Sequence, residues 1–158
     1  MKRTPLKRKT RLNARSGFKR HTIKPKPIKR KKRSRSKKPS IRLLKSKLWN
    51  ECKRIIRARH GNVCYSCGAQ GLEGSNWQTG HFIASSCCST HMRYNLNNLR
   101  PQCMRCNIHM SGNWVPYEAH LKKDGIDVEA LKQENEDTKN EMYRADWYEA
   151  KIAEYKLL

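Results

Sequence analysis

Residues 64–67 read Cys-Tyr-Ser-Cys and residues 103–106 read Cys-Met-Arg-Cys, so the chain contains two CxxC pairs. In each CxxC pair the two thiolates can point the same way, and two pairs supply the tetrahedral set of four sulfur ligands that zinc prefers. A pair of disulfides is the alternative, but the thiols of an intracellular chain stay reduced. We therefore predict one structural zinc ion, bound by Cys64, Cys67, Cys103 and Cys106.

Short secondary-structure elements surround the two cysteine pairs. Alternation and β-branched residues predict a strand over Gln78–Ile83, and a second short strand is predicted over Asn97–Gln102. The chain has no helix breaker between the second pair and Gly112, which suits a short helix. Upstream, apolar residues recur every three or four positions from Ile41 until Gly61, as in an amphipathic helix. The expected body is a small α+β domain with helical flanks.

The positive charge of the chain is concentrated near its N-terminus. The chain has 158 residues and a formal net charge of +23, and residues 1–50 hold 22 Lys and Arg with no acidic residue. Because residues 1–40 contain few large apolar side chains, we expect a disordered basic arm. Such a polycation binds nucleic acid by releasing counterions from phosphate, and a solvated or localisation segment is the alternative. Phosphate contacts are expected from its densest run, Lys29, Arg30, Lys31, Lys32 and Arg33.

The composition also argues against some classes of protein. No run of about 18 apolar residues occurs, so no transmembrane helix is expected. No apolar segment follows the basic N-terminus as it would in a secretory signal. We expect an intracellular protein whose partner is nucleic acid and not a membrane.

The motifs resemble those of a known group of nucleases. His81, Asn-Leu at residues 98–99 and Asn107 after the second cysteine pair have the spacing of the HNH-type ββα-metal nucleases. Gly-His-Phe at residues 80–82 and Ser-Gly-Asn at residues 111–113 narrow the resemblance to the phage NinG family, also called Rap. The resemblance covers about residues 43–125 and implies a zinc-stabilised ββα-metal (HNH-like) domain. It also implies a metal-dependent DNA endonuclease that acts on branched recombination intermediates such as Holliday junctions and D-loops.

Each residue that the resemblance places in the site has a chemical reason to be there. Neutral histidine can take a proton from an attacking water near neutral pH, so His81 is expected to be the general base. Asn98 is expected to orient the imidazole through its backbone or its side chain. The amide oxygen of Asn107 can provide one ligand to a catalytic Mg²⁺, and His109 is a further candidate ligand. Gly80 stands where the common HNH pattern has an acidic ligand, so the ligand set stays open.

Three arginines lie in the part of the chain that contains no carboxylate, between Glu73 and Glu118. Guanidinium groups there would most simply bind DNA phosphates, and solvation at the surface is the alternative for each of them. The three candidates are Arg93, Arg100 and Arg105.

The chain is expected to have three parts. Residues 1–42 are the basic DNA-binding arm, residues 43–115 the zinc-bound HNH-like nuclease domain, and residues 116–158 a helical C-terminal extension. A homodimer would suit a symmetric four-way junction, and recombination proteins of the phage or its host are further candidate partners in the bacterial cytoplasm. The alternative function is a non-catalytic zinc-ribbon protein that binds nucleic acid, which would keep the cysteines but have no use for His81.

Overall fold

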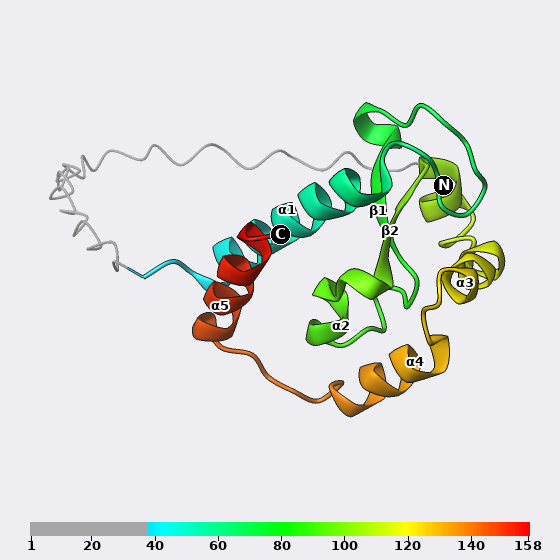
Figure 1. The fold of residues 1–158 in the computed structure, drawn as a ribbon. Coiled ribbons are helices and arrows are strands. Elements are labelled where there is room, and N and C mark those ends of the chain that lie inside the picture. The colour runs from blue at the N-terminus through cyan, green and yellow to red at the C-terminus, as the bar shows by residue number, and fades with distance from the viewer. Residues whose placement is uncertain (1–37) are drawn as a thin grey trace, which may run out of the picture. The chain divides into compact units, whose positions relative to one another are not determined.

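A computed structural model describes residues 38–158, which belong to one compact unit. The expected basic arm at residues 1–42 therefore lies almost wholly outside the described residues, together with its five candidate phosphate contacts at residues 29–33. The elements follow one another along the chain (Figure 1) as α1 (Ile41–His60), η1 (Gly74–Asn76), β1 (Gln78–His81), α2 (Thr90–Tyr94), η2 (Leu96–Asn98), β2 (Leu99–Gln102), η3 (Arg105–His109), α3 (Trp114–Lys123), α4 (Val128–Asp137) and α5 (Ala145–Lys156).

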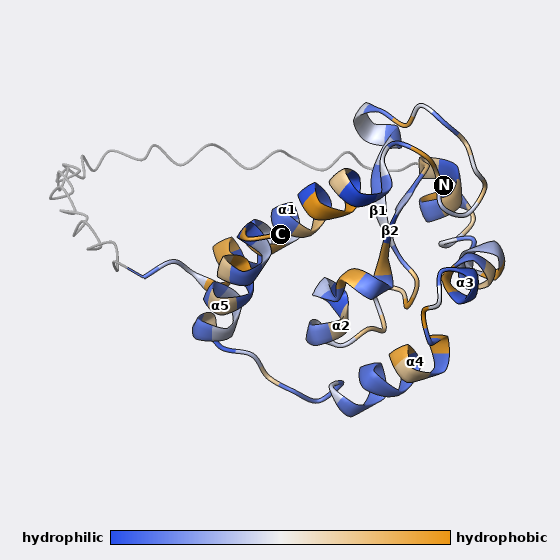
Figure 2. Ribbon diagram, in the orientation of Figure 1, coloured by the Kyte–Doolittle hydropathy of each residue, from blue (hydrophilic) through white to orange (hydrophobic). Residues whose placement is uncertain are grey.

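Helix α1 is the long amphipathic helix that the apolar spacing predicts. The side chain of Ser40 caps its first turn by accepting a hydrogen bond from the backbone N–H of Leu43, at 3.3 Å. Gly61 ends the helix with a positive φ of 67°, a conformation that favours glycine. Bands of apolar and polar residues alternate along the helix (Figure 2), and the buried ones are Leu44, Leu48, Cys52, Ile55 and Ile56.

Helix α5 packs along α1 and closes the largest apolar cluster (Figure 1). Tyr148, Ile152 and Tyr155 bring buried side chains from α5 to this cluster. The Tyr155 hydroxyl donates a hydrogen bond of 2.8 Å to the backbone oxygen of Tyr94, which joins α5 to α2 as well. The expected C-terminal extension is thus part of the same compact unit as α1, and the boundary expected between residues 115 and 116 falls inside α3.

Strands β1 and β2 form a two-stranded antiparallel sheet in which Gln78 pairs with Gln102 and His81 with Leu99. Both strands are shorter than the predicted ones. Beyond the pair of His81 with Leu99, the side chain of Asn98 binds the backbone of Ile83 in place of a backbone partner on the other strand. Its Oδ1 accepts from the backbone N–H of Ile83 at 2.7 Å, and its Nδ2 donates to the oxygen of the same residue at 3.3 Å. The chain from Leu96 to Asn98 is a 3₁₀ turn instead of strand.

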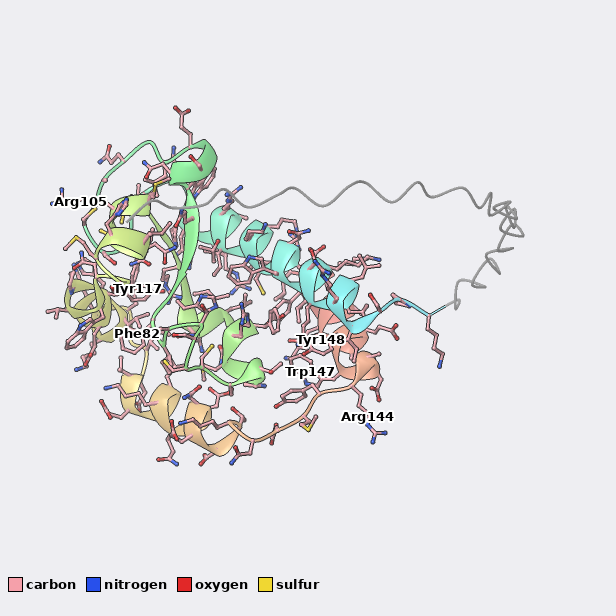
Figure 3. The ribbon with its side chains drawn as sticks, turned by 180° about the vertical axis from the view of Figure 1, so that it is seen from behind. Phe82, Arg105, Tyr117, Arg144, Trp147 and Tyr148 are labelled. Atoms are coloured by element: carbon pink, nitrogen blue, oxygen red, sulfur yellow. The ribbon has the colours of Figure 1, made fainter. Side chains whose placement is uncertain are left out.

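A second apolar cluster lies on the other side of the sheet from α1, around α3 and α4. Tyr117 is fully buried, and Figure 3 shows it beside Phe82, whose ring centre is 5.6 Å from its own. Asp127 caps the start of α4, because its carboxylate accepts from the backbone N–H of Ala130 at 3.0 Å. Helix α3 begins at Trp114, so Pro116 lies within its first turn.

No helix between residues 38 and 158 combines the length and apolar character that crossing a bilayer requires.

The two leucines of α1 that differ most in burial test how far the α1–α5 packing stabilises the domain. Leu48 is completely buried, whereas Leu43 is 47% exposed. We expect Leu48→Ala to lower the free energy of unfolding by about 2–5 kcal/mol, through lost burial and a residual cavity. Leu43→Ala on the same helix should change it by about 0.5 kcal/mol or less. Urea unfolding followed by circular dichroism measures both, and equal losses would contradict the packing.

Candidate functional site

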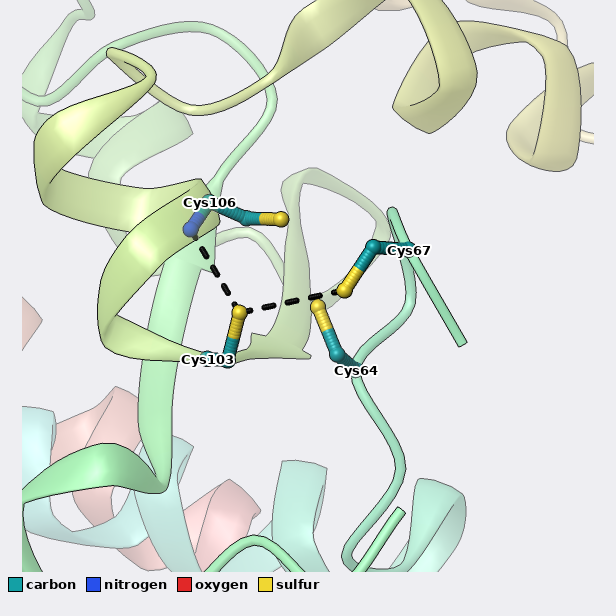
Figure 4. Close-up of side chains that lie close together, drawn as sticks. All are labelled: Cys64, Cys67, Cys103 and Cys106. Carbon is teal, nitrogen blue, oxygen red and sulfur yellow. Dashed lines mark hydrogen bonds between the residues drawn. The ribbon is translucent and has the colours of Figure 1, made fainter. Parts of the chain in front are cut away.

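The four cysteines of the two CxxC pairs lie together, and their sulfur atoms are all within 4.8 Å of one another (Figure 4). The Sγ atoms of Cys67 and Cys103 are 3.8 Å apart. Tetrahedral coordination with Zn–S bonds of about 2.3 Å requires sulfur atoms about 3.8 Å apart, so the spacing fits a bound ion. Cys64, Cys103 and Cys106 are buried and Cys67 is exposed, which makes this cluster a site that could hold a structural metal ion.

Backbone and amide groups around the cluster donate hydrogen bonds to sulfur. The backbone N–H of Cys106 points at the Cys103 sulfur, 3.4 Å away, and the Asn113 side chain donates to the Cys106 sulfur at 3.4 Å. Asn113 can do so because it ends a tight turn with φ of 44°, a conformation that asparagine tolerates. The Ser-Gly-Asn motif at residues 111–113 thus helps to hold a cysteine in place.

The thiols of the cluster differ in acidity. Burial, and to a smaller extent the neighbouring thiols of Cys67 and Cys103, raise the pKa of Cys106 to about 12 although the hydrogen bond from Asn113 lowers it. Burial also opposes ionisation of Cys64, but backbone hydrogen bonds at Cys103 and Cys67 outweigh it and lower the pKa to about 7. Four sulfur atoms this close cannot all carry charge unless a cation compensates them, so metal binding would displace protons.

His81 is the last residue of β1 and lies between α1 and α2. Its ring stacks on Trp49 of α1 with 5.2 Å between ring centres and 5° between planes. Its Nε2 lies 3.1 Å from the backbone oxygen of Arg93 in α2. A carbonyl oxygen only accepts, so Nε2 carries the proton and Nδ1 of the neutral ring keeps its lone pair. Burial, together with the positive charge of Arg93, lowers the pKa of His81 to about 4 although the backbone contact opposes the shift.

Asn98 does not orient the imidazole in the way that the sequence suggests. The side chain is completely buried, and its amide donates to the backbone oxygens of Ile83 and Met92, at 3.3 and 3.1 Å. Its own backbone oxygen accepts from the N–H of Phe82, directly after His81. Asn98 therefore fixes the loop after β1 and the end of α2, and the partner of His81 Nε2 is the carbonyl of Arg93.

The face of the sheet opposite His81 carries Gly80, Gln102 and Asn107. A Cβ added to Gly80 would stand 1.8 Å from Oε1 of Gln102 and 3.1 Å from Oδ1 of Asn107. Gln102 cannot easily withdraw, because its Nε2 donates to Ser66 Oγ and to the Gly112 oxygen, both at 2.6 Å. The glycine at this position, where the HNH pattern has a carboxylate, thus follows from the buried glutamine beside it.

Asn107 follows the second cysteine pair and turns its amide toward the sheet. Its Nδ2 donates to Oε1 of Gln78 at 2.6 Å, which leaves Oδ1 on the side of Gly80. Successive residues of a strand face opposite sides, so His81 and Asn107, which lies beside Gly80, are on opposite faces of the sheet. His109 is exposed at the end of η3 and is outside the one group of metal-binding side chains found among residues 38–158.

The three candidate arginines have different surroundings. Arg100 is buried, and its Nη1 donates to the backbone oxygens of Leu96 and Leu99, at 3.1 and 2.7 Å. Its guanidinium also lies over the ring of Tyr65, 5.2 Å from the centre. Burial of Arg100 and the contacts of its Nη1 with backbone oxygens argue against the predicted phosphate contact, because they keep the guanidinium from the surface. Arg93 and Arg105 are exposed, and Figure 3 shows Arg105 at the periphery of the molecule.

A cavity of about 360 Å³ next to His81 was not evident from the sequence. It lies between α1 and α2, and Trp49 is part of its wall. The sequence contained one indication of this wall: Lys45 and Trp49 are four residues apart, so they lie on the same face of the helix. The cavity is lined by Lys45, Ser46, Trp49, Thr90, Arg93 and Tyr94.

The fold and site define a small mixed α/β domain in which a two-stranded sheet adjoins a four-cysteine cluster that could bind metal. A family model described as "Bacteriophage Lambda NinG protein" matches residues 1–158, and the chain belongs to the NinG family.

Phage proteins with the name "Protein ninG" are among the relatives of this chain. That of Salmonella phage P22 is 32% identical over 103 residues, which are 65% of this chain and 49% of the phage protein. That of Escherichia phage lambda is 38% identical over 68 residues, 42% of this chain and 32% of the relative. The chain thus spans about half or less of the length of these relatives. No solved structure matches it.

Removing one cysteine of the cluster should unfold the domain, because three sulfur ligands leave a structural ion incompletely held. We expect Cys106→Ser to lose bound metal, from about one ion per chain to about none, and to become sensitive to protease. Cys87→Ser removes an exposed cysteine outside the cluster and should keep both metal and protease resistance. Atomic emission and limited trypsin digestion measure these properties. A folded, metal-free Cys106→Ser protein would show that the cluster is not a structural site.

Adding a side chain at residue 80 should cost stability because of Gln102. We expect Gly80→Ala to lower the free energy of unfolding by about 1–3 kcal/mol through overpacking. In the Gln102→Ala background the same change should cost less, so that a double-mutant cycle gives a coupling of about 0.5 kcal/mol or more. Chemical denaturation of the four proteins provides the numbers. Strict additivity would mean that Gln102 is not the obstacle.

Proposed function

We propose that this protein is a metal-dependent DNA endonuclease with an HNH-like ββα-metal site, which hydrolyses phosphodiester bonds in branched recombination intermediates such as Holliday junctions and D-loops. The observation that carries the proposal is the hydrogen bond from His81 Nε2 to the Arg93 oxygen. It leaves Nδ1 unprotonated on a ring that burial keeps neutral at physiological pH.

His81 acts as the general base in this mechanism. Its Nδ1 takes the proton of the water that attacks phosphorus, and the imidazolium that forms is stabilised by the Arg93 carbonyl on the other nitrogen. Stacking on Trp49 restricts the ring to one orientation, so little entropy is lost when the substrate binds. Asn98 is a positioning residue, because it fixes the loop that follows His81 and the end of α2.

Asn107 is the proposed protein ligand of a catalytic Mg²⁺. Its Oδ1 is free of the hydrogen bond that its Nδ2 makes to Gln78, and it lies beside Gly80 at the end of β1. Magnesium prefers oxygen ligands, keeps several waters and is often bound through substrate phosphates, so one amide oxygen is compatible with its chemistry. When bound, the ion would supply a Lewis acid for the charge that develops on the phosphate and the leaving oxygen.

The four-cysteine cluster holds a structural zinc ion in this proposal. Closed sites of four cysteines are typical of structural zinc, and here the cluster joins the loop before β1 to the turn after β2. The ion therefore stabilises the sheet that carries His81 without taking part in hydrolysis.

The basic charge of the chain supports DNA as the substrate. Arg93, Arg105 and the lysine- and arginine-rich run at residues 29–33 are the proposed phosphate contacts. A homodimer would present two sites to a four-way junction, and recombination proteins of the phage or the host are further proposed partners in the bacterial cytoplasm.

Substitution of His81 tests the proposal and separates it from the alternative of a non-catalytic zinc-ribbon protein. We expect His81→Ala to cut a synthetic four-way junction about 10²–10⁴-fold more slowly with Mg²⁺, with unchanged junction affinity in chelator. His109→Ala removes an exposed imidazole outside the site and should cut like the wild type. A linear duplex of the same sequence measures selectivity for branches. Tight binding with no cutting by the wild type in any divalent ion would favour the zinc-ribbon protein.

The pH dependence of cleavage gives a second measure of the same role. A base works in its unprotonated form, so kcat/KM should fall as the pH drops through the pKa of His81 in the free enzyme. Because that pKa is lowered to about 4, the rate should stay level between pH 5 and 7 instead of halving near the ordinary value of 6.5. An acid limb centred near 6.5 would mean that another group limits the reaction.

A further inference from the structure

The cavity between α1 and α2 has the chemistry of an anion site. Lys45 and Arg93 bring two positive charges from different elements, and Ser46 and Thr90 bring hydroxyl groups that can donate hydrogen bonds. None of the described residues that line it is acidic. Lys45 is held near the cavity because its ammonium lies 5.9 Å from the ring centre of Tyr148.

The cavity is joined to His81 through two residues of its wall. Trp49 stacks on the imidazole with one of its faces, and Arg93 binds Nε2 with its backbone oxygen while its side chain lines the cavity. An anion held by Lys45 and Arg93 would thus be separated from the proposed base by Trp49 and Arg93. Consecutive phosphates along one nucleic-acid strand are separated by a single nucleotide, which suits two neighbouring sites of this kind.

We infer that this cavity binds a backbone phosphate of the strand that is cut. This phosphate is the neighbour of the scissile phosphate, at which His81 activates the attacking water. The inference rests on the proposed endonuclease function and adds a substrate-positioning site to it. Lys45 and Arg93 neutralise the phosphate, and the hydroxyls of Ser46 and Thr90 fix its orientation. The site sets the register of the strand and carries no base specificity, since phosphate contacts do not distinguish sequences.

Salt-dependent binding tests the site without any need for cleavage. The probe is a fluorescently labelled synthetic four-way junction, titrated with full-length protein in chelator over a series of salt concentrations. One phosphate contact contributes about 0.9 to the slope of log K against log salt. Lys45→Ala and Arg93→Ala should each flatten the slope by up to about 0.9. The double variant should flatten it by about 0.9 and no more, because both residues bind the same phosphate. Lys45→Arg should restore most of the slope.

Matched controls separate local binding from loss of charge. Lys47→Ala lies on α1 but outside the cavity, and Arg144→Ala changes an exposed arginine at the start of α5, so each removes one positive charge elsewhere. Both should keep nearly the wild-type slope. If the cavity variants behave like these controls, or if the double variant loses clearly more than the slope of one phosphate, about 0.9, the site is overturned.

Cleavage measured on the same variants distinguishes this site from the proposed function. If the wild type cuts the junction, Lys45→Ala should raise KM more than it lowers kcat, and an unchanged KM would overturn the site while the nuclease stands. If the wild type cuts nothing but the slopes change as expected, the phosphate site stands and the endonuclease proposal fails.

Discussion

The approach of four sulfur atoms to within 4.8 Å is the constraint on which the rest of the domain depends. The sheet has only two strands of four residues each, and so small a sheet is marginal without further support. The cysteines close a loop across it, because one pair precedes β1 and the other follows β2. The same closure sets η3 and the turn at residues 111–113, and therefore the positions of Asn107 and of the oxygen that Gln102 uses.

The short helix α2 contributes Tyr94 to the apolar cluster between α1 and α5, and it also adjoins His81. Met92 and Tyr94 are buried, and their backbone oxygens accept from Asn98 and Tyr155 respectively. Arg93 stands between them with its oxygen on His81 and its side chain toward the cavity. A shift of this one turn would move the acceptor of His81 and the guanidinium of Arg93 together, so packing and electrostatics here are coupled.

The features that the sequence predicts correctly are those encoded by residues close together in the chain. The cysteine cluster and α1 were predictable, because ligand spacing and helical period are local patterns. Helix α2 was missed, since five residues are too few to show a period. Arg100 looked like a phosphate contact because its charge is visible, whereas the backbone oxygens that it binds appear only when η2 folds. Asn98 was found by its motif, but its partners depend on a loop whose course no pattern encodes.

The contact between Gly80 and Gln102 restricts how the site can change over evolutionary time. In the proposed nuclease a carboxylate at residue 80 would add a metal ligand, yet the space that it needs is occupied by a glutamine fixed at its far end by Ser66 and Gly112. Substitution of Gly80 alone passes through a destabilised intermediate, so a smaller residue must replace Gln102 first. The order of the two mutations is therefore set by sterics, and a lineage that keeps the glutamine is expected to keep glycine at residue 80.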